Sequence, residues 1–289
     1  MTTAALMKNA VAELEAVGIA REDAVSDVRF LVCDALKIEY KDLLLMQTED
    51  ADEEAAKLIA SYIDKRKKRI PCQYITGKAC FMGRDFIVAE GVLVPRPETE
   101  LLVENAIKLA DVIDGSRQGL KVLDLCTGSG CIGISFFLER DCVDEVTLSD
   151  ISYDALKTAA KNRDMLAPEV SIIKSDLFDS IDERFDIILS NPPYIKSSDI
   201  EELEPEVKDC EPRLALDGKA DGLYFYRRII DELEEHLNDN GICAFEIGYD
   251  QGEAVGQLLV DAGFSEVGVI KDYAGLDRIV TGILVKTVQ

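Results

Sequence analysis

The feature that most constrains the fold is an alternation of apolar and amphipathic segments that begins at Lys121. Apolar runs of strand length read "KVLDL", "EVTLSD", "VSIIKSD", "FDIILS", "GICAFEIG", "FSEVGVI" and "RIVTGILV". Stretches with helical periodicity separate most of these runs, for example residues 152–163 and 222–237. Because strands that are apolar throughout are covered on both faces, the alternation predicts a mostly parallel sheet between two layers of helices. The short loop between the last two runs predicts one antiparallel strand.

The N-terminal part of the chain has a different pattern. Apolar residues recur at helical spacing over residues 6–17, 22–36 and 52–70, which predicts a small helical bundle over residues 1–70. Short β-rich runs broken by glycine then predict a β-hairpin linker over residues 71–94. A helix follows the sequence "PRPETE", which starts at Pro95. The predicted domains are therefore 1–70, the linker 71–94, and an α/β domain over 95–289.

Composition excludes several classes of protein. The 289 residues contain no apolar run of transmembrane length, and the amphipathic, partly acidic N-terminus does not resemble a signal peptide. None of the eight cysteines forms a CxxC pair, and the only histidine, His236, is expected on a helix surface. No disulfide framework and no metal site are predicted, and a reducing cytoplasm is the expected compartment.

The charge favours some partners over others. The formal net charge is −24, and nearly all of it lies after residue 80. Such an acidic surface repels phosphate backbones, so the expected partner is neutral or basic, such as a protein; solubility alone is the alternative explanation. The one basic run, "KRKKR" at 65–69, is predicted to be a solvated complement to a helix dipole, with partner contact as a secondary possibility.

A glycine-rich loop follows the first strand of the predicted sheet. In "LDLCTGSGCIG" the residues Gly128, Gly130 and Gly133 fit G-x-G-x-x-G, and Asp150 ends the next strand. Strand, loop, helix and acid together indicate a nucleotide-like cofactor, with the ribose hydroxyls on Asp150. Asp124, just before the loop, would oppose a pyrophosphate but suit a cation. The loop therefore favours S-adenosylmethionine, and it leaves NAD open.

The sequence "NPPY" (191–194) directly follows the apolar run "FDIILS". It stands at the carboxyl end of a predicted strand, where open α/β sheets bind ligands. Pro192 and Pro193 fix φ and donate no hydrogen bonds, so the segment is stiff and its carbonyls can accept. Asn191 adds a side-chain acceptor and Tyr194 a flat ring. This combination suits a planar –NH2 group, whereas the alternative is a rigid turn that caps the strand.

Together, "LDLCTGSG" and "NPPY" resemble the amino-group methyltransferases of the seven-stranded S-adenosylmethionine-dependent fold (class I, Rossmann-like). That superfamily acts on adenine, cytosine, guanine and glutamine. The segments "QYITGKACFMGRDFIV", "VLVPRPETE", "EPRLALDGKADGLYFY" and "DYAGLDRIV" resemble successive blocks of the HemK/PrmC family, the peptide chain release factor N5-glutamine methyltransferases. The resemblance covers nearly the whole chain. Cys126 departs from a more usual glycine, and Leu177 from a more usual tryptophan.

The resemblance implies a site and a reaction. The methyl group would pass from S-adenosylmethionine to the glutamine of the Gly-Gly-Gln loop in class 1 release factors. The residues that it implies for the cofactor are Asp124, Cys126, Thr127, Gly128, Ser129, Gly130, Asp150, Asp176, Leu177 and Asn191. Those implied for the substrate are Phe81, Arg96, Pro97, Glu98, Asn191, Pro192, Pro193 and Tyr194.

Within that site, Asn191, Pro192 and Tyr194 would be catalytic. The Asn191 Oδ1 atom and the Pro192 carbonyl would accept the two amide N–H bonds, and Tyr194 would pack on the amide plane. No general base is evident. The helical domain is expected to dock the body of the release factor, and the protein to act as a monomer that binds neither nucleic acid nor membrane.

Four other functions are compatible with part of the sequence. A ribosomal protein could supply the glutamine. A nucleic-acid amino-methyltransferase needs a basic cleft, which the acidic charge disfavours. A NAD-dependent dehydrogenase would explain the glycines but leave "NPPY" without a role. A non-catalytic interaction protein would leave the complete set of site residues unexplained.

Overall fold

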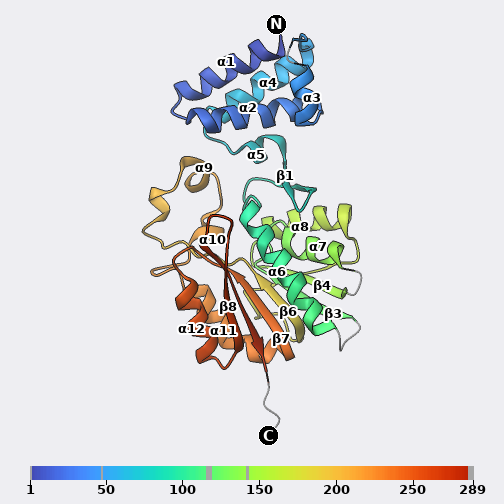
Figure 1. The fold of residues 1–289 in the computed structure, drawn as a ribbon, viewed down its shortest axis with the longest axis vertical. Coiled ribbons are helices and arrows are strands. Elements are labelled where there is room, and N and C mark those ends of the chain that lie inside the picture. Colours follow the sequence, from blue (N-terminus) through green and yellow to red (C-terminus); the bar gives the residue numbers. More distant parts are fainter. Residues whose placement is uncertain (1, 47, 115–118, 141–142, 286–289) are drawn as a thin grey trace. The chain divides into compact units, whose positions relative to one another are not determined.

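The computed structural model describes residues 2–46, 48–114, 119–140 and 143–285 (Figure 1). Over these residues, no helix combines the length and the apolar character needed to cross a bilayer.

The chain divides into two compact units. The first, which we call the helical unit, comprises residues 1–78 together with 204–210. The second, the sheet unit, comprises residues 79–203 and 211–289. The chain therefore passes from one unit to the other three times. Nothing in the local sequence pattern indicates that residues 204–210 join the helical unit.

The helical unit is built on amphipathic helices with ordinary capping signals. Thr2 caps the first helix, where its Oγ1 accepts from the Ala5 amide at 3.3 Å, and Asp52 caps a later one through the Ala55 amide at 2.8 Å. Apolar faces that include Leu14 and Ile59 form a buried core of their own. The helices of this unit are α1 (Thr3–Ala16), α2 (Arg21–Leu36), α3 (Tyr40–Leu45), α4 (Glu53–Arg66), α5 (Cys72–Thr76) and α9 (Pro205–Lys208).

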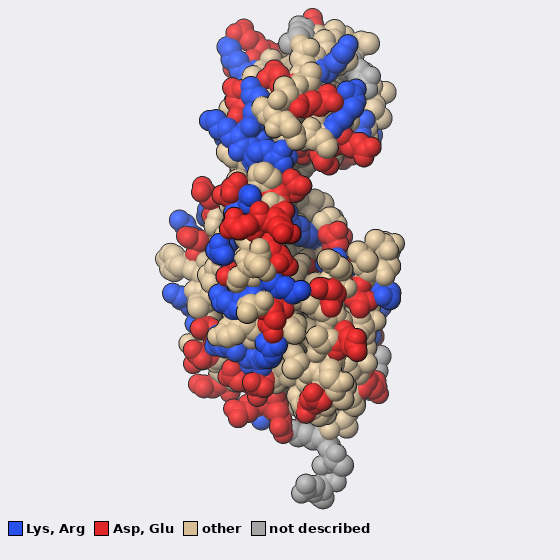
Figure 2. Space-filling view, turned by 90° about the vertical axis from the view of Figure 1, so that its left-hand side faces the viewer, with Lys and Arg blue, Asp and Glu red and all other residues tan. Residues whose placement is uncertain are grey.

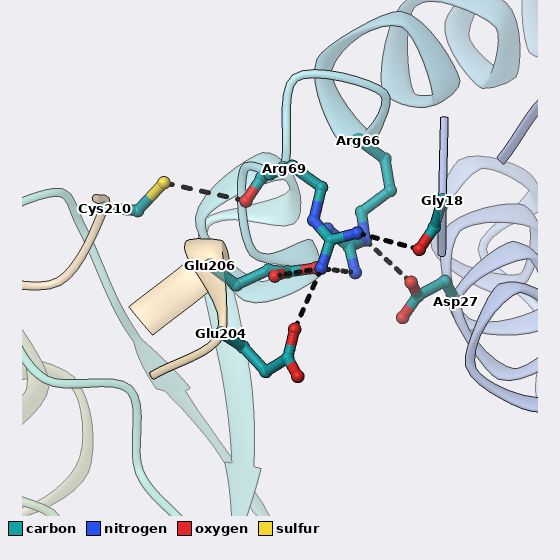
Figure 3. A network of polar contacts seen from close by, with 7 residues as sticks. All are labelled: Gly18, Asp27, Arg66, Arg69, Glu204, Glu206 and Cys210. Atoms are coloured by element: carbon teal, nitrogen blue, oxygen red, sulfur yellow. Dashed lines mark hydrogen bonds and ion pairs between the residues drawn. The ribbon is translucent and has the colours of Figure 1, made fainter. Parts of the chain in front are cut away.

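The prediction that the basic run at 65–69 is solvated is wrong for its two arginines. The Arg66 side chain is only 7% exposed and forms ion pairs with Asp27 at 2.7 Å and Glu206 at 2.6 Å. Arg69 binds Glu204 and Glu206, at 3.2 and 2.8 Å (Figure 3). Acidic side chains thus pair with the two arginines of the run because the chain returns over residues 204–210.

The sheet unit begins with a β-hairpin and continues into the alternating pattern that the sequence predicted. The hairpin is shorter than expected, because residues 72–76 are helical and belong to the other unit. The strands are β1 (Lys78–Phe81), β2 (Arg84–Ile87), β3 (Leu120–Leu125), β4 (Val143–Asp150), β5 (Ser171–Lys174), β6 (Phe185–Ser190), β7 (Leu237–Glu246), β8 (Ser265–Lys271) and β9 (Asp277–Leu284). Its helices are α6 (Pro97–Asp114), α7 (Cys131–Glu139), α8 (Tyr153–Leu166), η1 (Ile200–Glu202), α10 (Arg213–Leu216), α11 (Tyr224–His236) and α12 (Gly252–Asp261).

Among the described residues, the main sheet has seven strands in the order β5-β4-β3-β6-β7-β9-β8. Only β9 runs antiparallel to its neighbours in this sheet, which confirms the predicted antiparallel strand. In Figure 1, α6, α7 and α8 lie on one side of the sheet, and α11 and α12 on the other. Each side has a separate buried apolar cluster. The predicted fold class, a seven-stranded mostly parallel sheet covered on both faces, is confirmed.

The predicted exposure of the single histidine is also wrong. His236 was expected on the surface of its helix, but it is only 9% exposed. Its ring stacks on Phe178 with centroids 4.3 Å apart. It is the last residue of α11, and its Nδ1 atom lies 3.2 Å from the Glu183 carbonyl oxygen.

Candidate active site

A cavity of about 290 Å³ opens in the sheet unit where β3, β4, β5 and β6 end. Parallel strands present their carboxyl ends at one edge, so residues distant in sequence meet there. The predicted site residues that line the cavity are Arg96, Cys126, Thr127, Gly128, Ser129, Asp150, Asp176, Leu177, Asn191 and Pro193.

Two glycines of the loop adopt backbone conformations that favour glycine. Gly128 and Gly130 both have positive φ, +57° and +83°. A Cβ on Gly128 would meet no atom within 4 Å, so a ligand can approach the backbone there. A Cβ on Gly133 would lie 2.4 Å from Leu148 Cδ2, so this glycine allows α7 to pack closely on the sheet.

Asp124 lies beneath this loop, fully buried, and not at the cavity wall. Its Oδ2 atom accepts from the Thr127 hydroxyl at 2.5 Å and from the Gly133 amide at 2.8 Å. Burial raises the pKa of this carboxyl to about 7. The two hydrogen bonds oppose the rise, and the charge of the neighbouring Asp150 adds to it. In this structure Asp124 ties the loop to its following helix; direct contact with the cofactor stays a prediction.

Asp150 and Asp176 stand at the ends of neighbouring strands. Asp150 accepts from the Gly128 amide at 2.9 Å and from the Ser152 amide at 2.8 Å. Each carboxylate oxygen has a second lone pair, so both remain able to accept a ribose hydroxyl. Asp176 follows β5, where its carboxylate is held by Arg228 at 2.9 Å.

The "NPPY" segment continues directly from β6. Ser190, its preceding residue, pairs with Leu125 of β3 on one side and Phe245 of β7 on the other. Asn191 and Pro193 line the cavity, whereas Pro192 does not. Tyr194 lies behind the wall, where its hydroxyl is 3.4 Å from Glu246 Oε1. Burial and the negative charge of Glu246 raise the pKa of this phenol.

The predicted substrate residues before β3 fall in different places. Arg96 lines the cavity and binds the buried Glu211 at 2.7 Å. Pro97 and Glu98 form the first turn of α6 beside it. Phe81 is fully buried and packs edge-on against Phe86, with ring centroids 6.0 Å apart. Their substrate contacts stay predictions.

Several residues that line the cavity or lie behind it were not predicted from the sequence. Thr99, Tyr224 and Arg228 line the cavity, and Glu246 and Gln251 lie behind Tyr194. Tyr224 belongs to the segment "EPRLALDGKADGLYFY", for which the family resemblance implied no site residue. Glu246 is a lone acid in the apolar run "GICAFEIG", and an acid inside a core strand could have been recognised as a signal.

The residues at the cavity suit S-adenosylmethionine as the bound cofactor. Asp150 offers carboxylate oxygens for ribose hydroxyls, and Leu177 offers apolar surface beside Asp176 for a flat base. The open space at Gly128 admits a group against the backbone. The fold and this cavity define an S-adenosylmethionine-dependent methyltransferase.

Comparison with known proteins identifies the family of the chain. It matches the Methyltransferase small domain family over residues 99–219 and the PrmC N-terminal domain over residues 5–77. The release factor glutamine methyltransferase of Clostridium acetobutylicum is 41% identical, over 90% of this chain and 91% of that protein. The protein of the same name from Agrobacterium fabrum is 37% identical, over 93% and 92%. The chain belongs to the release factor glutamine methyltransferase family, which confirms the resemblance.

A solved structure supports the fold alone. A methyltransferase from Pyrococcus furiosus superimposes with a TM-score of 0.51 at 18% identity, covering 78% of this chain and 98% of that one.

Proposed function

We propose that this protein transfers a methyl group from S-adenosylmethionine to the side-chain N5 of the glutamine in the Gly-Gly-Gln motif of class 1 release factors. The observation that carries the proposal is the position of Asn191 and Pro193 at the wall of the same cavity as the glycine loop. The names of the relatives support the choice of a release factor as substrate.

The chain's own residues account for the reactivity of the amide. An amide nitrogen is a poor nucleophile because its lone pair is delocalised into the C=O bond. Asn191 Oδ1 and the Pro192 carbonyl accept the two N–H bonds, which fixes the nitrogen and favours its rehybridisation. Orientation of this kind contributes roughly 7–11 kcal/mol in well-aligned systems. S-adenosylmethionine, when bound, supplies an electrophilic methyl group on a sulfonium.

The surface charge agrees with a protein substrate. Acidic and basic side chains are interspersed on the face in view in Figure 2, over a chain with a net charge of −24. Nucleic acid binding relies on clustered Lys and Arg that neutralise phosphates. A protein loop needs no such cluster.

The direct test is mass spectrometry of a class 1 release factor after incubation with the protein and S-adenosylmethionine. We expect a gain of one methyl group on the peptide that contains Gly-Gly-Gln, located on the glutamine by fragmentation. Ribosomal proteins and rRNA serve as parallel substrates. Methylation of either of these, with the release factor unmodified, would contradict the proposal.

Asn191→Ala tests the acceptor role within the same assay. Loss of an oriented hydrogen bond in the site should cost about 2–3 kcal/mol, a rate loss of roughly 30- to 150-fold, measured at saturating S-adenosylmethionine because Asn191 is also an implied cofactor residue. Asn105→Ala is the matched control, because Asn105 lies on α6 and bonds the Leu101 carbonyl. A near wild-type rate for Asn191→Ala would show that the acceptor model is wrong.

A further inference from the structure

The "NPPY" segment is held at both of its ends. At its start, Ser190 pairs with Leu125 of β3 and with Phe245 of β7, so the sheet fixes the backbone that enters the segment. At its end, the Tyr194 carbonyl accepts from the Gln251 Nε2 atom at 3.0 Å. The two prolines between these ends restrict the backbone, so fixing both ends also fixes the middle of the segment.

The side-chain amide of Gln251, the residue that precedes α12, is buried and fully hydrogen-bonded. It is 5% exposed, and its Nε2 atom donates not only to Tyr194 but also to the Gly222 carbonyl, at 3.2 Å. Its Oε1 atom accepts from the Gly248 amide at 2.9 Å. Because carbonyls only accept and a backbone amide only donates, these partners determine which end of the side-chain amide is oxygen.

The segment 216–222 lies directly against the end of "NPPY". The Ile195 amide donates to the Leu216 carbonyl at 3.0 Å. Gly222 has φ +76°, and a Cβ there would lie 2.4 Å from the Tyr194 carbonyl oxygen, so only glycine fits at this position. The two segments are therefore in close contact, and the Gln251 side chain anchors both of them to the connection between β7 and α12.

We propose that Gln251 is a positioning residue for methyl transfer, which fixes the far end of "NPPY" and thereby holds the acceptors of Asn191 and Pro192 in place for the substrate amide. The inference rests on the proposed function, because the two acceptors matter only if the substrate nitrogen donates to them. Without the Gln251 donor, the Tyr194 carbonyl loses this anchor and the acceptors can shift. Misplacement of an active-site group by about 1 Å can cost up to about 100-fold in rate.

The test replaces Gln251 with glutamate, which has nearly the same shape. Gln251→Glu keeps an acceptor for the Gly248 amide, but it exchanges the donor for an oxygen that faces two carbonyl oxygens. We expect kcat, at saturating S-adenosylmethionine and release factor, to fall about tenfold, as for loss of one net hydrogen bond. Gln251→Met removes the donor without adding charge and should show a similar loss, so it serves as the test if the glutamate variant folds poorly. The control is Gln257→Glu, the same change at an exposed glutamine of α12, which should keep the wild-type kcat.

A double-mutant cycle with Asn191→Ala distinguishes positioning from a general loss of stability. If Gln251 acts through the acceptors, Gln251→Glu should lower kcat by no more than about threefold once Asn191 is replaced, because only the Pro192 carbonyl is then left to position. A merely structural role would make the two losses multiply.

A measurement without turnover follows Tyr194. The chain has nine tyrosines, and the ring signal of Tyr194 in ¹³C-tyrosine-labelled protein is assigned by its loss in Tyr194→Phe. This signal should shift in Gln251→Glu but not in Gln257→Glu, while the signal of Tyr62 in the helical unit should stay in place in both. An unchanged kcat in the Gln251 variants, losses that multiply in the cycle, or a Tyr194 signal that does not move would each overturn the proposal.

The two levels of inference fail differently. If the wild-type protein leaves release factors unmodified, the proposed substrate is wrong while the Tyr194 signal still tests the anchoring by Gln251. If the wild type methylates the release factor and the Gln251 variants do so equally well, only the positioning role is wrong.

Discussion

At the scale of single residues, two departures from the usual family pattern share a backbone feature. Cys126 has φ +61° and Leu177 has φ +50°, both in the left-handed region, and both line the cavity. That conformation costs roughly 1–2 kcal/mol for a residue with a Cβ, which explains why glycine is usual at the first of these positions. Strain of this kind is found at binding sites held by surrounding structure.

The residues that sequence could place in the site are those at strand ends. Asp150, Asp176 and Asn191 each follow an apolar run, and parallel strands bring such ends together. Thr99 and Glu246 could not be placed in this way. The contact of Thr99 with Asn191 and that of Glu246 with Tyr194 depend on how α6 and the strands β6 and β7 pack, which no local pattern encodes.

The raised pKa of Asp124 predicts how the free energy of unfolding depends on pH. Its folded pKa of about 7 lies above the value near 3.9 of an unfolded aspartate. Below about pH 4 both states are protonated, and the fold buries no charge. Between about 4 and 7 the unfolded state loses its proton first, so the free energy of unfolding decreases as pH rises.

Asp124→Asn keeps an acceptor for Gly133 and removes the titration. From pH 5 to 7.5, urea denaturation should therefore show a decline in unfolding free energy that is about 1–3 kcal/mol smaller in this variant than in the wild type. The exposed Asp179→Asn is the control and should follow the wild type. Parallel pH profiles for wild type and Asp124→Asn would contradict the assigned role of burial.

At the scale of elements, periodicity predicted most helices and strands, and the errors have physical causes. The short helix α3 was missed because six residues span too few turns to show a period. The basic run at the end of α4 was taken as solvated because Lys and Arg are rarely buried without partners. Its partner Glu206 lies 140 positions after Arg66, and only the tertiary structure brings them together.

Because its ion pairs are largely buried, we expect substitution of Arg66 to lower the free energy of unfolding strongly. Arg66→Met removes a buried cation from between Asp27 and Glu206, whose side chains are 20% and 17% exposed. Removing one partner of a buried pair costs about 3–5 kcal/mol, so urea denaturation should show a destabilisation of that order. Lys67→Met, which changes a neighbouring cation in surface pairs with Glu13 and Asp64, should have little effect. Equal effects of the two substitutions would contradict the distinction between buried and surface pairs.

At the scale of the whole molecule, the sequence indicated two parts but not their discontinuity. Both the bundle and the alternating segment are visible as periodic patterns. The stretch 204–210 is short and polar, and it carries no periodic signal that would assign it to either part. It belongs to the helical unit because Arg66 and Arg69 bind its two glutamates, and because Cys210 Sγ lies 3.6 Å from the Arg69 carbonyl (Figure 3).

Hydrogen exchange can test this assignment in the intact chain. The amides of Val207, Lys208 and Asp209 donate to carbonyls within α9 and its N-cap, a single turn too short to persist alone. Their protection must come from the anchored glutamates, so a peptide over 204–210 should exchange faster in Arg66→Met, measured by mass spectrometry. A peptide over β6 (185–190) serves as the internal reference and should exchange as in the wild type, because its strand lies in the core of the sheet unit. Unchanged exchange over 204–210 in Arg66→Met would mean that the pair of Arg66 with Glu206 does not hold the segment in place.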